Sequence, residues 1–200
     1  DCKRMGIYWD FAPVVDVNTN PANPIIGNRS FGSDVNNVIA KGLAYAQGLQ
    51  DNGVLASMKH FPGHGDTDKD SHLDLPVVSH HLERLDSIEL APFKALMDKK
   101  IGGVMVAHLY VPALEKKKGI PATLSYNIVT NLLKNKYNYK GLVITDALNM
   151  NAVAQKFPAG ELDLKAFKAG NDLLLFSQDV PNGKALIKKA IEKGEISEER

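Results

Sequence analysis

The fold of this chain is decided by residues 54–72, whose sequence is VLASMKHFPGHGDTDKDSH. Residues 54–58 follow a glycine and are mostly apolar, which predicts a buried β-strand. Two glycines and a proline interrupt residues 59–72, so this part cannot form a regular helix. We therefore expect a strand that ends in Lys59 and His60 and opens into a polar loop. Functional residues commonly lie on such loops when a rigid scaffold holds them.

Three interpretations of this loop remain open from its residues alone. In the first, the carboxylate of Asp70 orients the imidazole of His72 for general acid–base catalysis. In the second, a metal ion binds the residues of suitable type, which are His60, His64, Asp66, Asp68, Asp70 and His72. In the third, the loop is solvated and its aspartates and glycines only form turns.

Composition excludes several classes of protein. At 200 residues the chain is one domain or part of a larger one. A net charge of +1 argues against a nucleic-acid surface and against a polybasic membrane patch. We expect no membrane span, because no apolar run approaches the required length. Cys2 is the only cysteine, so an internal disulfide is impossible. The sequence begins with Asp1 and not with Met, which is the expected result if a leader peptide has been removed. The sequence does not identify the cellular compartment.

Apolar segments alternate with helical patterns along the chain. Five segments of this kind predict strands, near Val14, Leu55, Val104, Val143 and Leu174. Helices between the strands require a parallel sheet with right-handed crossovers. No Gly-x-Gly-x-x-Gly motif follows a strand, so a dinucleotide-binding fold is not indicated.

Capping residues and breakers mark where the helices begin and end. Ser33 or Asp34 caps the first helix, and residues 82–99 form a helical region in which Pro92 starts a second helix. Ser125 caps the helix that follows the third predicted strand. Further helices are predicted over residues 162–169 and 181–193 and after Ser197.

Polar residues end strand after strand. These residues are Asp16, Lys59, His60, His108 and Asp146. In a (β/α)8 barrel the carboxyl ends of the strands converge on the active site, so these side chains are candidates for function. The ordinary alternative for each is a hydrogen bond to a neighbouring loop.

Several of these segments resemble the signatures of family-3 glycoside hydrolases, and more narrowly the bacterial β-N-acetylglucosaminidase branch. The matching segments are KHFPGHG at 59–65, DSH at 70–72 and TDALNM at 145–150. Residues 10–17 and 28–32 fit the same pattern. The resemblance covers nearly the whole chain, and the DSH loop is specific to this branch.

The resemblance implies an α/β fold, a (β/α)8 TIM barrel. Only part of the barrel is expected, with parallel strands from about the third strand onward. Residues 1–200 would form a single fragment of the catalytic barrel, without the first strands and the C-terminal end. Five strands cannot close an eight-stranded barrel, so we expect the isolated fragment to be inactive. The full-length protein could carry an additional domain.

The resemblance also implies roles for single residues. Asp146 would be the nucleophile, His72 the acid/base and Asp70 its partner. Three residues would hold the N-acetylglucosamine hydroxyls, and these are Arg29, Lys59 and His60. His64 is assigned to loop structure. No cofactor and no metal ion are expected.

The expected function is that of a retaining exo-β-N-acetylglucosaminidase. It would hydrolyse terminal β-linked N-acetylglucosamine from peptidoglycan-derived sugars through a glycosyl-enzyme intermediate. The expected partner is therefore a carbohydrate substrate and not a nucleic acid. Alternatives are another family-3 β-glycosidase, a phosphorylase, and a non-catalytic sugar-binding barrel. Phosphorolysis stays open because a neutral imidazole does not repel an incoming phosphate.

Overall fold

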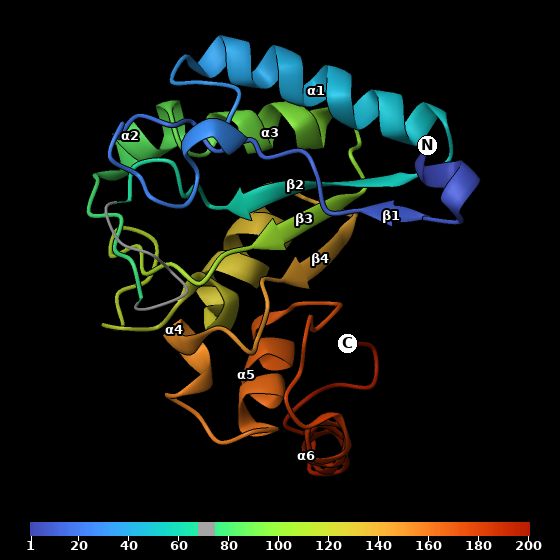
Figure 1. The fold of residues 1–200 in the computed structure, drawn as a ribbon. Coiled ribbons are helices and arrows are strands. Elements are labelled where there is room, and N and C mark those ends of the chain that lie inside the picture. Colours follow the sequence, from blue (N-terminus) through green and yellow to red (C-terminus); the bar gives the residue numbers. More distant parts are fainter. Residues whose placement is uncertain (68–74) are drawn as a thin grey trace.

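A computed structural model describes residues 1–67 and 75–200, and these residues form an α/β fold around an open parallel sheet (Figure 1). The strands, in chain order, are β1 (Trp9–Asp10), β2 (Leu55–Phe61), β3 (Gly103–Val106) and β4 (Leu142–Thr145). They lie side by side in the same order and all run parallel. The fold prediction is confirmed, because parallel neighbours in chain order that do not close into a ring are what a partial (β/α)8 barrel requires.

Helices connect the strands and cover the sheet. The α-helices are α1 (Val35–Asp51), α2 (Leu82–Ser87), α3 (Ala91–Asp98), α4 (Asn151–Ala154), α5 (Glu161–Ala169) and α6 (Val180–Glu192). A π-helix spans Asn127–Lys136, and three short 3-10 helices span Cys2–Met5, Gly27–Arg29 and Ala122–Leu124. Helices α1 and α3 pack together on one side of the strands, whereas α4, α5 and α6 follow β4 at the other end of the molecule (Figure 1). No helix of the described part is long and apolar enough to cross a membrane.

Predicted caps and breakers account for most helix ends. The carboxylate of Asp34 accepts a hydrogen bond of 2.7 Å from the Asn37 N–H, so Asp34 caps α1. Ser125 Oγ accepts from the Ile128 N–H at 3.2 Å at the start of the π-helix. Pro92 lies in the first turn of α3, where a missing N–H costs little. The helix predicted to begin at Ser197 stays a prediction, because only residues 198–200 follow it and residues 198–199 form a turn.

The predicted fifth strand at residues 172–176 is reduced to a single β-bridge between Leu173 and Ile144. Backbone hydrogen bonds still join the segment to β4, and side chains supply some of the remaining partners. The carboxylate of Asp172 accepts from the Val143 N–H at 2.9 Å, and Thr145 Oγ1 accepts from the Leu175 N–H at 3.0 Å. The segment therefore lies beside β4, as predicted, without strand geometry.

The first predicted strand is also shorter than its apolar pattern. β1 ends at Asp10, and beyond it one isolated β-bridge joins Val14 to Lys59, while the Ala12 and Pro13 carbonyls still accept hydrogen bonds from β2. Pro13 lies between these two points and has no N–H to donate to a ladder. The Val15 N–H still donates to the Lys59 carbonyl at 2.8 Å, which keeps Asp16 close to the end of β2.

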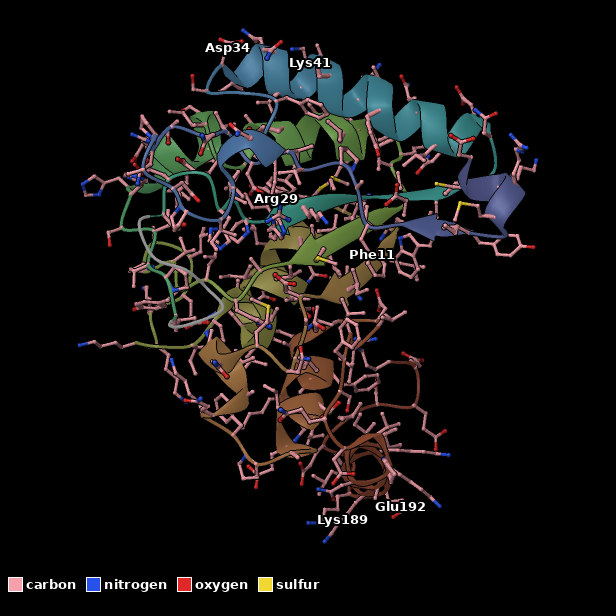
Figure 2. All side chains as sticks on the ribbon, viewed as in Figure 1. Phe11, Arg29, Asp34, Lys41, Lys189 and Glu192 are labelled. Carbon is pink, nitrogen blue, oxygen red and sulfur yellow. The ribbon has the colours of Figure 1, made fainter. Side chains whose placement is uncertain are left out.

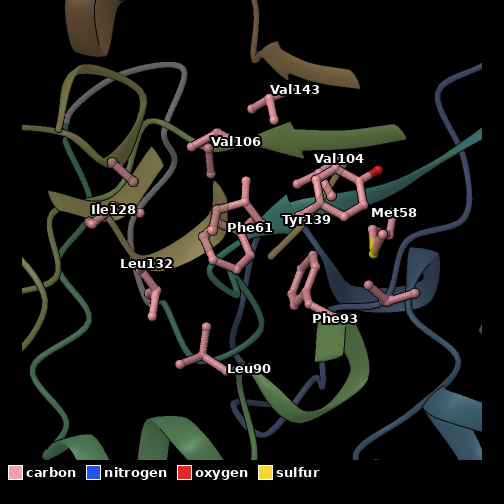
Figure 3. Packing of buried hydrophobic residues seen from close by; sticks show 14 of the residues in the cluster. Met58, Phe61, Leu90, Phe93, Val104, Val106, Ile128, Leu132, Tyr139 and Val143 are labelled. Carbon is pink, nitrogen blue, oxygen red and sulfur yellow. The ribbon is translucent and has the colours of Figure 1, made fainter. Parts of the chain in front are cut away.

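The main hydrophobic core lies between the sheet and the helices (Figure 3). Phe61 of β2 and Phe93 of α3 are fully buried, and their rings meet edge to face at 5.2 Å. A second, smaller core consists of Leu148, Val153, Leu162 and Ala166. Helix α5 joins the two, because its Ala169 belongs to the main core.

A glycine lets the loop after β2 lie against the backbone of residue 17. A Cβ atom on Gly65 would be 1.9 Å from the Val17 carbonyl oxygen and 2.5 Å from the carbonyl carbon. Real Cβ atoms do not approach backbone atoms so closely, so only glycine fits there. The contact brings residues 16–18 alongside the loop that carries the KHFPGHG motif.

We expect Gly65→Ala to lower the free energy of unfolding by about 1–3 kcal/mol, because the new methyl group must push two backbone segments apart. Gly48→Ala is the matched control. Gly48 is an exposed residue of α1 with open space around it, so the same change should raise stability by about 0.5–1 kcal/mol. Urea unfolding measures both values. Equal stabilities would mean that the residue-17 backbone moves aside freely.

Candidate active site

A pocket of about 260 Å³ at the carboxyl ends of the strands collects four of the predicted site residues. Lys59 and His60 reach it from the end of β2, and Asp146 reaches it from the residue after β4. Arg29 comes from the 3-10 turn Gly27–Arg29 and points toward the sheet (Figure 2). The pocket combines one carboxylate with these three basic side chains and the ring of His64, as a site for a polar ligand requires.

A larger hollow elsewhere lacks this chemistry. A groove of about 560 Å³ between α5 and α6 is lined mainly by aliphatic side chains, among them Leu174, Val180, Ile187 and Ile191. Its size exceeds that of the strand-end pocket, but its surface offers few polar groups for a sugar. We therefore place the candidate active site at the strand ends.

Asp146 is held by backbone hydrogen bonds on both sides. Its N–H donates to the Val106 carbonyl at 2.8 Å, and its Oδ1 accepts from the Ala147 N–H at 2.9 Å. Burial raises the pKa of the carboxyl, but the nearby rings of His60 and His108 and the Ala147 N–H outweigh it, so the pKa lies below its usual range. The carboxylate is therefore ionised at neutral pH.

Lys59 lies in a crowded cationic environment. Burial lowers the pKa of its ammonium group, and repulsion from Arg29 lowers it further, while Asp146 acts in the opposite direction. The net shift is downward. Lys59 therefore releases its proton more readily than a surface lysine does.

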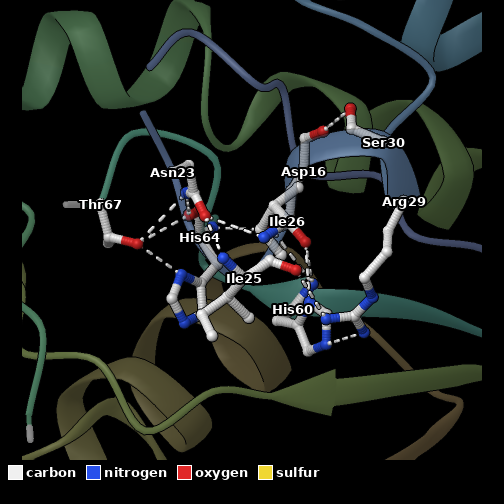
Figure 4. Close-up of polar contacts among 9 residues, drawn as sticks. All are labelled: Asp16, Asn23, Ile25, Ile26, Arg29, Ser30, His60, His64 and Thr67. Atoms are coloured by element: carbon white, nitrogen blue, oxygen red, sulfur yellow. Dashed lines mark hydrogen bonds and ion pairs between the residues drawn. The ribbon is translucent and has the colours of Figure 1, made fainter. Parts of the chain in front are cut away.

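The carboxylate of Asp16 anchors the end of β2 (Figure 4). Asp16 is completely buried, and His60 Nδ1 lies 2.7 Å from its Oδ2. The His64 N–H donates to Oδ1 at 2.7 Å, and the His60 N–H donates at 3.1 Å to Oδ2. On the other side of the His60 ring, Nε2 lies 3.3 Å from Nη2 of Arg29. Asp16, His60 and Arg29 thus form a continuous chain of contacts.

His64 is tied into the loop itself, in keeping with the role expected for it. Its ring is buried, and Nδ1 lies 2.7 Å from Thr67 Oγ1. Its carbonyl accepts from Nδ2 of Asn23 at 2.7 Å, and Asn23 also receives N–H groups from Ile25 and Ile26 (Figure 4). These contacts join the loop after β2 to the segment that ends at Arg29.

His108, at the end of β3, is fully buried and positions the segment that follows Asp146. Its Nδ1 lies 2.8 Å from Thr123 Oγ1, and its Nε2 lies 3.0 Å from the Ala147 carbonyl. A carbonyl only accepts, so Nε2 carries the proton. His108 therefore matches the hydrogen-bonded alternative for a strand-end residue.

Two predicted catalytic residues, Asp70 and His72, lie outside the described residues. Their placement relative to Asp146 therefore stays a prediction. Asp16, a strand-end candidate to which no role was assigned, organises the basic side of the pocket. No local sequence signal marks Asp16 as the partner of His60, because 44 residues separate them.

The metal-site interpretation is not supported by the residues that can be placed. Within residues 1–67 and 75–200, the grouping with suitable ligand atoms is Asp66, His80 and Glu89, which differs from the predicted set. The guanidinium of Arg84 lies 3.3 Å from Glu89 Oε1 and 3.8 Å from Asp66 Oδ2. Arg84 already supplies the positive charge that a metal ion would bring, so these residues form a salt-bridge network beside the loop.

Asp66 should contribute to stability in a pH-dependent way. Burial raises its pKa, but hydrogen bonds from His80 and Thr19 and the charge of Arg84 lower it below the ordinary 3.8. A depressed pKa gives stability that is complete above the ordinary value and is lost as the pH falls through the folded value. We therefore expect the stability difference between wild type and Asp66→Asn to shrink between about pH 5 and pH 2.

Urea unfolding at several pH values measures this difference. Asp51→Asn, which removes an exposed carboxylate at the end of α1, controls for the change in net charge. A difference between wild type and Asp66→Asn that stays constant over this range would contradict the proposed pairing.

The chain is similar to known proteins over nearly its whole length. Residues 1–200 match the glycosyl hydrolase family 3 N terminal domain. The chain is 38% identical over 192 residues to beta-hexosaminidase A of Pseudoalteromonas piscicida, covering 91% of the chain and 32% of that protein. It is 41% identical over 202 residues to beta-hexosaminidase LpqI of Mycobacterium tuberculosis, covering 97% of the chain and 51% of LpqI.

A solved structure shares both the fold and the sequence. The family-3 β-N-acetylglucosaminidase from Paenibacillus sp. str. FPU-7 superposes with a TM-score of 0.92 at 46% identity, covering 99% of the chain and 38% of that protein. The chain thus spans between about a third and a half of the length of these relatives. On the match over all 200 residues, the chain belongs to the glycosyl hydrolase family 3 N-terminal domain family.

Proposed function

We propose that the protein containing this chain is a retaining exo-β-N-acetylglucosaminidase that acts on peptidoglycan-derived sugars. One observation carries the proposal: the Asp146 carboxylate shares a strand-end pocket with Arg29, Lys59 and His60. A nucleophile and hydroxyl-binding groups are the parts that glycoside hydrolysis needs on one side of the sugar. The relatives named beta-hexosaminidase support the choice of N-acetylglucosamine.

In this mechanism Asp146 attacks the sugar directly. A carboxylate oxygen forms a bond to C1 while the bond from C1 to the leaving oxygen breaks, which gives a glycosyl ester. The low pKa of Asp146 keeps the attacking group ionised. Its two backbone hydrogen bonds fix the direction of attack, so little conformational freedom is lost in the reaction.

Arg29, Lys59 and His60 bind the sugar. Arg29 and Lys59 offer N–H donors to hydroxyl oxygens, and His60 lines the same pocket. Phe11 and Phe176 also line the pocket and offer aromatic surface to a sugar ring. The resulting mixture of donors and apolar surface suits a pyranose.

His72 completes the reaction as acid and base, with Asp70 as its partner. His72 gives its proton to the leaving oxygen in the first step. In the second step it takes a proton from the water that attacks C1, and the bond to Asp146 breaks. The Asp70 carboxylate stabilises the imidazolium between the two steps.

We expect Asp146→Asn to leave the fold intact and to reduce turnover by at least roughly 1,000-fold, because an amide oxygen is a poor nucleophile. Asp51→Asn should retain full activity. Peptide mass spectrometry after reaction with a slow fluorinated N-acetylglucosaminyl donor should locate the label on Asp146. Label on a different residue would refute the assignment.

We expect His72→Ala to slow cleavage of unactivated substrates by roughly 10²–10⁴-fold and that of activated aryl glycosides far less. Activated leaving groups need little protonation, so they do not depend on a general acid. Asp70→Ala should show the same pattern. The test is to measure turnover of the complete enzyme on a series of substrates that differ in their leaving groups. An equal loss of turnover on activated and unactivated substrates would exclude His72 as the acid/base.

A further inference from the structure

The hydrogen bonds around His60 determine where its proton lies. Oδ2 of Asp16 can only accept when the carboxylate is ionised, and it lies 2.7 Å from Nδ1 of His60, so Nδ1 carries a proton. The pKa of Asp16 lies below its usual range. Burial raises this pKa, but the interactions of the carboxylate with His60 and His64 lower it by a larger amount.

The other side of the ring has the opposite requirement. Nη2 of Arg29 lies 3.3 Å from Nε2 of His60, and a guanidinium can only donate. Nε2 must therefore present a lone pair. The two contacts together require a neutral His60 with its single proton on Nδ1.

Arg29 depends on that lone pair. Its side chain is exposed, and its other contact within its own turn is a hydrogen bond of 3.2 Å from Nη1 to the Ile25 carbonyl. A long exposed side chain has many rotamers, and ordering it costs conformational entropy. The acceptor on His60 selects the rotamer that lines the pocket.

We propose that Asp16 is a positioning residue of the sugar subsite, which acts by fixing His60 in the Nδ1–H tautomer so that Nε2 holds Arg29 toward the substrate. The inference rests on the proposed function only for the identity of the ligand. Asp16 itself is buried behind His60 and does not line the pocket. Its effect on the sugar therefore passes through two side chains.

Asp16→Asn tests this assignment because it keeps the shape and changes only the contacts at Oδ2, which are the His60 ring and one branch of the hydrogen bond from the His60 N–H that Oδ1 shares. The amide oxygen, placed at Oδ1, still accepts from the N–H groups of His60 and His64. The amide nitrogen, placed at Oδ2, donates to Nδ1 of His60. The ring proton must then move to Nε2, where it meets a donor of Arg29 and expels the guanidinium.

Nitrogen NMR of the complete protein, labelled with ¹⁵N only at histidine, reads the tautomer directly. His60→Gln assigns the signals. At neutral pH, wild type should show a protonated Nδ1 and an unprotonated Nε2, and Asp16→Asn should show the reverse. A wild-type His60 that is protonated at Nε2, alone or together with Nδ1, overturns the proposal, even if Asp16→Asn does not fold.

Binding of N-acetylglucosamine provides the second readout. Asp16→Asn should raise the dissociation constant roughly tenfold, the lower end expected for loss of a charged hydrogen bond. In an Arg29→Met background the same change should have an effect within about twofold. An undiminished loss in that background would mean that Asp16 acts through general structure, which also overturns the proposal.

Ser30→Ala is the matched control. Ser30 Oγ donates to the Asp16 carbonyl at 2.6 Å, so this variant disturbs the same segment but leaves the carboxylate unchanged. It should keep the Nδ1–H tautomer and bind the sugar normally. If wild type does not bind N-acetylglucosamine, the proposed function fails, and the tautomer measurement still decides the role of Asp16.

Discussion

The buried carboxylate of Asp16 is the interaction on which the candidate site depends. A charge removed from water is costly unless donors surround it, and Asp16 receives the N–H groups of His60 and His64 together with the His60 ring. These donors come from the loop after β2, whereas Asp16 belongs to the segment before Arg29. One ion therefore joins the two parts of the chain that supply the basic side of the pocket.

Much of the fold could be predicted because local patterns and tertiary structure agree. The apolar segments near Leu55, Val104 and Val143 are strands, and Asp34 and Ser125 cap helices as their residue types suggest. The prediction was less accurate where side chains replace backbone partners. Residues 172–176 have a strand-like composition, but the side chains of Asp172 and Thr145 accept backbone N–H groups at that edge, and composition does not reveal such contacts.

The site was predictable in part. Parallel strands place their carboxyl ends at one edge, so Lys59, His60 and Asp146 could be expected to meet there, and they do. Arg29 followed from the family resemblance alone, because it lies in an irregular segment without periodicity. The chain of contacts from Asp16 to Arg29 depends on distances across 44 and 31 residues, and no pattern in the sequence records those distances.

The division of the interior into two cores has a consequence for the order in which the protein opens. The small core of Leu148, Val153, Leu162 and Ala166 has far fewer buried residues than the main core, so we expect α4 to α6 to open at a lower free energy. Asp146 lies at the boundary between these helices and β4. The basic half of the pocket belongs to the stable core, whereas the segment that follows the carboxylate belongs to the part that we expect to open first.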